Sequence, residues 1–307
     1  MPDTTCRKLQ NRPGRSVIAL RSGCVVLFGL PFLICGIVWF VAVTMVIPSE
    51  LNRTDIPAWV WAIGGVIFIL AGGAICGYGL REMIRSRRTR ERLEAHPGHV
   101  WLADHPWDMT GVTDHALRAT LTPLLLTGSV ILFLLPFNYI ALFVDDSFFV
   151  RSLVGLFDLG AVGLVGYAIY RLVRYAKFGS SELHFRSFPF FLGEAFEAEL
   201  STPRCLGGLR SIGMALRCVE ERFETSSDDT HEVVCYQIYG DTVRLEPERD
   251  YRAADAALPV RFPLPADGRP TVLSERPPVY WELEVTGDAP GVDWKTRFLL
   301  PVYARPE

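Results

Sequence analysis

Four apolar runs, each long enough to cross a bilayer as a helix, constrain this chain more than any other feature. A bilayer core about 30 Å thick needs about 20 consecutive apolar residues in a helix. The runs cover residues 24–47, 58–80, 121–144 and 152–170. We predict two transmembrane hairpins, 24–80 and 121–170, followed by a separate domain. Because no small-x-small cleavage site follows Ile47, we interpret the first run as a retained helix rather than a signal peptide.

Lysine and arginine are distributed unevenly around these runs. Residues 1–23, residues 81–120 and the stretch just after 170 are basic, whereas the loops 48–57 and 145–151 carry one arginine each. Basic residues near span ends favour the cytoplasmic side of a membrane. We therefore predict a multi-pass protein of a bacterial plasma (inner) membrane with both termini in the cytoplasm.

Good helix formers continue the second run beyond residue 80 and predict a basic helix at the membrane surface. Each basic residue near anionic headgroups contributes about 1 kcal/mol, so the lipid bilayer is the first expected partner. The residues predicted to contact headgroups are Arg85, Arg87, Arg88, Arg90 and Arg92. The net charge of −3 and the absence of a folded basic module argue against nucleic-acid binding.

The fourth run contains one carboxylate, Asp158. An ionised aspartate at mid-bilayer costs about 2.5–3.5 kcal/mol, so such a residue is a functional candidate. The short loop 145–151 makes the third and fourth helices antiparallel neighbours, which places Asn138 at a similar depth. We favour an interhelical hydrogen bond between Asn138 and Asp158, and keep open a proton or cation relay or a water-exposed aspartate.

Glycines recur along one face of the second and fourth runs, at Gly73 and Gly77 and at Gly160, Gly163 and Gly166. Small residues let helix backbones approach closely in lipid. We favour close packing within one bundle over a homodimer formed through the same faces. The sequence leaves the oligomeric state open.

Histidines and acids gather between residues 96 and 117, where His96, His99, His105 and His115 lie near Asp104. Prolines and a glycine interrupt any regular helix there, and no HExxH motif occurs. The chain has seven cysteines but no CxxC pair, so we expect neither a metal site nor a disulfide framework. Trp101 and Trp107 are expected at the membrane interface or packed under the soluble domain.

The segment PGHVWLADHPWDMTGV, residues 97–112, resembles a pattern of proline, Trp-Leu, tryptophan and glycine found in bacterial membrane proteins of unknown function. An extra His-Pro pair before Trp107 departs from that pattern. The resemblance implies transmembrane hairpins joined to a C-terminal sandwich domain, and it supplies no catalytic residues.

From residue 178 the pattern changes to alternation, with inward residues such as Phe196, Ala198 and Leu200. Similar runs cover 212–218, 279–285 and 294–300, and turn clusters separate them. Period-two runs of this kind predict an antiparallel β-sandwich over 178–307. The stretches FPFFLGEAFEAELSTP and PVRFPLPADGRPTV also resemble arrestin-type or immunoglobulin-like sandwiches.

No nucleophile elbow, Walker sequence or GxGxxG motif occurs in the chain. We therefore expect no catalytic residues and no cofactor, and do not interpret the chain as an enzyme. The leading hypothesis is a membrane-anchored interaction or scaffold module whose sandwich binds a protein partner. The alternative is a small transporter or channel-like bundle that uses Asp158 as its intramembrane polar site.

Overall fold

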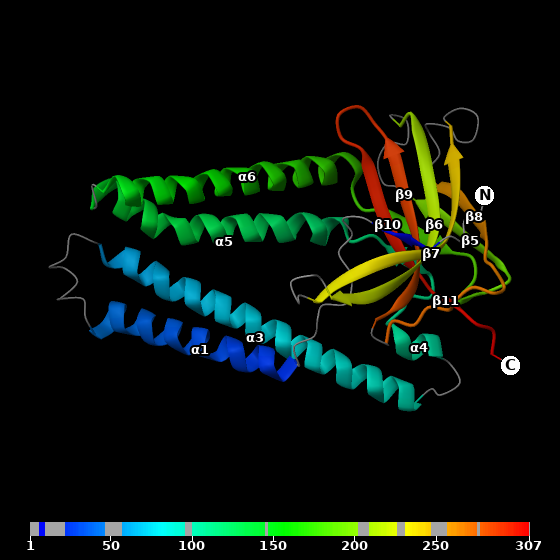
Figure 1. Ribbon diagram of the computed structural model, residues 1–307, viewed down its shortest axis with the longest axis horizontal. Helices are drawn as coiled ribbons and strands as arrows, with labels where there is room; N and C mark the ends of the chain where they lie inside the picture. The colour runs from blue at the N-terminus through cyan, green and yellow to red at the C-terminus, as the bar shows by residue number, and fades with distance from the viewer. Residues whose placement is uncertain are drawn as a thin grey trace. The chain divides into compact units, whose positions relative to one another are not determined.

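The computed structural model describes residues 6–9, 22–46, 57–95, 100–144, 147–201, 209–225, 231–246, 257–274 and 277–306. Four long apolar helices are followed by a C-terminal region of antiparallel β-sheets (Figure 1). The chain divides into two compact units. The helical unit comprises Leu20–Ser86 and Arg118–Leu172, and the β unit comprises Met1–Ala19, Arg87–Leu117 and Val173–Glu307.

The long helices follow the apolar runs. They are α1 (Ser22–Val41, continued by the π-helix η1, Ala42–Val46), α3 (Ala58–Ala95), α5 (Ala116–Phe143) and α6 (Phe148–Phe178). All four are long and apolar enough to cross a membrane. The helix α3 continues without a break to Ala95, as expected for the basic stretch, and its place at a membrane surface stays a prediction.

Glycines bring α1 and α3 into close contact, but they are not the glycines that the sequence singled out. A Cβ on Gly36 would lie 2.6 Å from the backbone nitrogen of Ile69, and one on Gly65 would lie 2.9 Å from that of Phe40. In contrast, a Cβ on Gly73 or Gly77 would meet nothing within 4 Å, and the same holds for Gly160, Gly163 and Gly166. Close packing of the chain through those five glycines was therefore a wrong prediction.

Two main sheets form the β unit. The five-stranded sheet has the order β1-β7-β6-β9-β10, and the four-stranded sheet has the order β2-β3-β5-β8. The first contains β1 (Arg7–Lys8), β7 (His231–Leu245), β6 (Ser211–Thr225), β9 (Val279–Asp288) and β10 (Trp294–Leu300). The second contains β2 (Gly111–Thr113), β3 (Glu182–Phe185), β5 (Ala195–Ser201) and β8 (Ala257–Pro263). A short parallel pair, β4 (Phe190–Phe191) with β11 (Val302–Tyr303), and the short helix α4 (Val100–Asp104) complete it.

The two sheets share one apolar core. Their inward side chains alternate as predicted, and Phe196, Leu216 and Trp281 are fully buried in the same cluster. The predicted inward residues of 212–218 and 294–300 also lie in the buried interior. The β unit is nevertheless wider than 178–307, since β1 and β2 come from segments far upstream.

Candidate functional site

Polar contacts join α5 to α6 in the helical unit. Asn138 Nδ2 donates a hydrogen bond to Asp158 Oδ1 at 2.9 Å, as the predicted pairing of these residues required. Arg151 Nε donates to the carbonyl oxygen of Ala141 at 3.0 Å, and Thr127 Oγ1 donates to that of Leu164 at 3.4 Å. Asp158 is the only acidic residue of α6, and its hydrogen bond to Asn138 links the two helices.

The five arginines predicted to contact lipid headgroups all lie on α3. Arg87 and Arg88 are exposed, and the side chains of Arg85, Arg90 and Arg92 lie outside the described residues. Headgroup contact stays a prediction for all five.

The segment between α3 and α5 is built into the β unit through a buried carboxylate, Asp104. Its Oδ1 accepts hydrogen bonds from the backbone nitrogens of Leu273 and Ser274, both at 2.7 Å. Its Oδ2 accepts one from the Tyr303 hydroxyl at 3.1 Å. Burial and the charge of Asp104 together raise the pKa of Tyr303 above its ordinary value, so the phenol stays protonated and donates.

Both tryptophans of this segment pack on the β unit, the second of the two sites expected for them. Trp107 Nε1 donates to the Tyr303 hydroxyl oxygen at 2.9 Å. Trp101 packs edge-on against Phe191, with ring centroids 6.0 Å apart. Further along, β2 pairs with β3, and Thr296 Oγ1 donates to Asp114 Oδ2 at 2.8 Å. The segment is thus a structural part of the β unit.

A second apolar cluster, here called the outer cluster, lies on the face of the five-stranded sheet that points away from the main core. Its buried members are Val219, Cys235, Tyr280 and Leu299, and its partly buried members are Leu9, Trp107 and Leu273. The N-terminal segment, the segment after α3 and the C-terminal region therefore meet in one cluster.

Glu221 corrects one sequence-based interpretation. The sequence suggests that Glu220 and Glu221 belong to a solvated strand end, but Glu221 is fully buried under the outer cluster. The hydroxyl of Tyr280 donates to Glu221 Oε1 at 3.2 Å. The segments that cover this face come from elsewhere in the chain, so the local sequence carries no sign of the burial.

The N-terminal segment forms an edge strand, which the sequence did not predict. β1 pairs antiparallel with β7, with Arg7 opposite Gln237 and Lys8 opposite Tyr236. The backbone nitrogen of Leu9 then donates to the carbonyl oxygen of Cys235 at 2.9 Å. A two-residue strand has no periodicity that a sequence could reveal.

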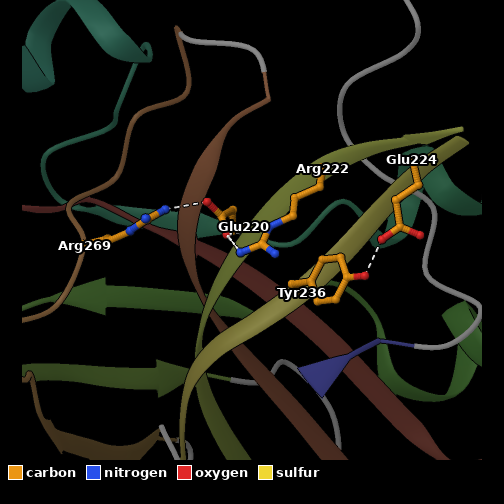
Figure 2. Close-up of polar contacts among 5 residues, drawn as sticks. All are labelled: Glu220, Arg222, Glu224, Tyr236 and Arg269. Atoms are coloured by element: carbon orange, nitrogen blue, oxygen red, sulfur yellow. Dashed lines mark hydrogen bonds and ion pairs between the residues drawn. The ribbon is translucent and has the colours of Figure 1, made fainter. Parts of the chain in front are cut away.

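A charged network runs over the β6–β7 surface beside β1, and Figure 2 shows most of it. Glu220 accepts hydrogen bonds from Arg269 and from Arg222, the latter from Nε at 2.9 Å. Burial raises the pKa of Glu220, but the bonds from Arg222 and Arg269 outweigh it and leave the pKa below its usual value. Arg222 also lies 4.8 Å above the ring of Tyr236.

The network ends at the N-terminal strand. The Tyr236 hydroxyl donates to Glu224, and Lys8 Nζ donates to Glu224 Oε2 at 3.1 Å. These two hydrogen bonds, with that from Tyr236 the larger, lower the pKa of Glu224 and keep it ionised at neutral pH. Glu224 of β6 thus presents an ionised carboxylate to Lys8 of β1, across the intervening strand β7.

The edge strand β8 of the four-stranded sheet is poorly suited to accept another strand. The backbone nitrogen of Leu264 donates to Glu194 in the β5 direction, so Pro263 and Pro259 face outward by alternation. Neither proline has an N–H to offer, and prolines at such positions protect sheet edges. In the five-stranded sheet, by contrast, β7 pairs with a further strand, the two-residue β1.

A buried acid among bases lies on the outer face near β10. Glu284 is 8% exposed and lies within 4 Å of Arg217, Lys295 and Arg297; the closest contact is 2.7 Å to Arg297 Nε. Burial raises the pKa of Glu284, but the three positive charges outweigh it and hold the pKa below its usual value. With three bases around one carboxylate the group carries a net positive charge, so it does not favour a further cation.

The described part of the chain contains no candidate metal centre. No three histidine, cysteine or acidic residues there lie together as metal ligands. His96 and His99 fall outside the described residues. The expectations of no metal and no catalysis stay predictions.

No protein-family model and no curated protein matches this chain. Among solved structures, it is similar to Spo0M, a sporulation control protein from Bacillus subtilis, at 18% identity and a TM-score of 0.28. The match covers 41% of this chain and 49% of Spo0M, so the chain spans about half of that protein's length. A likeness of this size carries no argument about function, and the family resemblance of residues 97–112 gains no support from it.

Proposed function

We propose that this protein is a membrane-anchored interaction module that binds a protein partner through the β6–β7 hairpin of its β unit. The proposal rests on the positions of the exposed apolar side chains. Among the described residues after 178, the exposed large hydrophobic side chains are Phe223 on β6 and Val243 on β7. Both belong to the hairpin that also carries the N-terminal strand: Phe223 lies opposite Val233 on the outer face, and Val243 lies opposite Met214 on the inner face. The hairpin thus offers an exposed apolar side chain on each face beside an edge that already accepts a strand.

The division into units supports a membrane anchor with one defined side. The N-terminal segment, the segment after α3 and the C-terminal region all belong to the β unit. If α1, α3, α5 and α6 span a bilayer, these three segments must share one side of it, because each hairpin returns the chain to where it began. The arginine distribution assigns that side to the cytoplasm. A reporter enzyme fused after Glu307 should then be active only inside the cell.

Site-specific photo-crosslinking in the native membrane tests the proposal. A photoreactive amino acid replaces Phe223 or Val243 in the full chain, and a matched position, Arg261, tests the proline-protected β8 edge. The proposal expects discrete protein adducts from the two hairpin positions and none from Arg261. Adducts with lipid alone, or adducts equally frequent at all three positions, contradict it.

The transporter alternative depends on Asp158. Its hydrogen bond to Asn138 is compatible with a purely structural role, which weakens this alternative without removing it. Substitution Asp158→Asn keeps the volume and a hydrogen-bonding group but removes the ionisable proton. A proton- or cation-dependent flux into proteoliposomes that this substitution abolishes would support transport, and an unchanged flux would reject the relay.

A further inference from the structure

We infer that the β7 edge, where Cys6–Leu9 lies, binds an extended basic segment of the partner protein, and that the chain's own N-terminal segment competes for this place. The inference rests on the proposed function and names its site and the chemistry of the partner. Its basis is the way β7 recognises a strand that is already present.

Backbone pairing supplies the first part of the recognition. Residues 7 and 8 pair in register with Gln237 and Tyr236, and Leu9 N bonds to Cys235 O. Main-chain hydrogen bonds of this kind give affinity for any extended segment, whereas side-chain pockets give specificity. The edge is therefore able to accept another segment of suitable side chains.

Side chains supply the second part. Successive residues of a strand point to opposite faces, and Lys8 lies on the face of Tyr236, where it meets Glu224 at 3.1 Å. Leu9 lies on the other face and packs on the outer cluster with Val219 and Tyr280. The site thus selects a lysine or arginine followed directly by a large aliphatic residue.

The occupant is suited to exchange. β1 comprises two residues, and the Lys8–Glu224 pair is solvent-exposed, with side chains 54% and 37% accessible. Exposed ion pairs contribute little to stability. Phe223 follows Val219 and Glu221 on the same face by alternation and is 45% exposed, so a longer segment would gain apolar contact there. A partner segment that covers Phe223 would bury more apolar surface on the hairpin than the two-residue β1 does.

A labelled synthetic peptide with the sequence of residues 4–12, with serine in place of Cys6, is the probe. It is titrated against the full chain in nanodiscs by fluorescence anisotropy. Substitution Lys8→Glu places two negative charges side by side, weakens docking of the N-terminal segment and should tighten peptide binding several-fold, because an internal competitor lowers apparent affinity. A scrambled peptide serves as the control.

A reversible lock provides the second measurement. Lys8 and Tyr236 form a non-hydrogen-bonded pair, since the neighbouring Leu9 makes the hydrogen bond, and such Cα atoms lie about 4.5 Å apart, within disulfide range. The variant Lys8→Cys/Tyr236→Cys, made in a Cys6→Ser background, should lose peptide binding when oxidised and recover it on reduction. Each single-cysteine variant is the matched control and should ignore the redox state.

Charge reversal tests the chemistry of the site. In a Lys8→Ala background, where no ion pair with residue 224 can re-form, Glu224→Lys should weaken binding of the lysine peptide several-fold and favour a peptide with glutamate in place of that lysine. The inference is overturned if the released variant binds no more tightly than the parent chain, or if the lock leaves binding unchanged.

The two proposals fail in distinguishable ways. If photo-crosslinks form at Phe223 while peptide binding ignores the lock, the partner binds elsewhere on the hairpin and only the site is wrong. If the peptide binds as expected but no protein adduct forms in the native membrane, the edge binds only the chain's own segment. Both the proposed function and the proposed partner are then rejected.

Discussion

The two faces of the five-stranded sheet are covered in different ways. The inner face packs on the four-stranded sheet, and the core between them draws almost entirely on strands from 178–307. The outer face is covered in part by Leu9, Trp107 and Leu273, which reach it from three separate segments. The inner face uses apolar contact, whereas the outer face combines a small apolar cluster with buried acids and hydrogen bonds.

The inner-face contacts stabilise the fold of the β unit, whereas the outer-face contacts attach the upstream segments to it. Apolar burial is non-directional, and a large contiguous core stabilises the β-sheets regardless of the upstream segments. Contacts such as those of Asp104 are directional, and they fix where the segment between α3 and α5 attaches. The inner face should therefore control global unfolding, and the outer face should control local attachment.

The largest effect is expected at the inner face. Trp281 is fully buried and its Nε1 donates to Arg269 O at 2.7 Å, so Trp281→Ala leaves a large cavity and removes this hydrogen bond. Such truncations cost about 3–5 kcal/mol. Denaturant unfolding of the full chain in nanodiscs, followed by β-sheet circular dichroism, should show the loss.

The matched control lies on the opposite face of the same sheet. Phe223 is exposed, and Phe223→Ala should change the unfolding free energy by about 0.5 kcal/mol or less. Comparable losses from the two substitutions would show that the faces do not differ in the way described.

The second prediction concerns attachment at Asp104. Substitution Asp104→Ala leaves the N–H groups of Leu273 and Ser274 and the Tyr303 hydroxyl without their acceptor. A buried donor left unpaired costs about 1–3 kcal/mol. We expect residues 100–114 to detach before the sheets unfold, which hydrogen exchange measured by mass spectrometry would show as faster exchange in that segment.

Asp108 offers a control in the same segment. It is exposed and caps Thr110 locally, with its Oδ1 accepting from Thr110 N at 2.9 Å. Asp108→Ala should leave exchange of the neighbouring residues 100–104 unchanged, because water replaces the lost acceptor. Equal acceleration in both variants would argue against a specific role for Asp104.

Sequence patterns revealed the inner face far better than the outer one. Apolar runs located all four helices, and period-two alternation identified inward residues such as Leu216 and Phe298. The same alternation places Glu282 and Glu284 outward, yet both are buried. Their cover depends on contacts between distant segments, which no local periodicity encodes.

Some polar contacts could likewise be predicted from the sequence and others could not. The Asn138–Asp158 contact followed from a short loop and matched depth, so connectivity alone was sufficient to anticipate it. The strands β1 and β2 contain two and three residues, too few for a periodic signal. The role of Asp104 as an acceptor for two backbone amides likewise becomes visible only in three dimensions.

A smaller, pH-dependent effect is expected at Glu284. Its pKa in the folded chain lies below the usual glutamate value of 4.5, so its stabilising contribution is present above about pH 4.5 and is lost as the pH falls through the folded pKa. Glu284→Gln should cost about 1–2 kcal/mol at pH 7, since its bases stay partly hydrated. The difference from the parent chain should disappear in acid, as unfolding measured at several pH values would show.

Glu197 is the control carboxylate for this titration. It pairs with Arg261, whose side chain is 76% exposed, at 3.1 Å. Glu197→Gln should be nearly neutral at every pH. A Glu284→Gln variant that is destabilised equally at all pH values would point to lost packing rather than lost charge.

The smallest effect is expected at the N-terminal strand, where the outer face ends. Lys8→Ala removes the contact with Glu224 but leaves the backbone bond from Leu9 to Cys235 possible. Exchange of the Leu9 amide should accelerate, while the amides that join β6 to β7 keep their protection, because global stability resides in the inner face. Arg7→Ala is the neighbouring control, since the Arg7 side chain forms no ion pair among the described residues. If Lys8→Ala instead loosens the whole β6–β7 ladder, β1 is part of the folding core, and the contrast between the two faces does not extend to this edge.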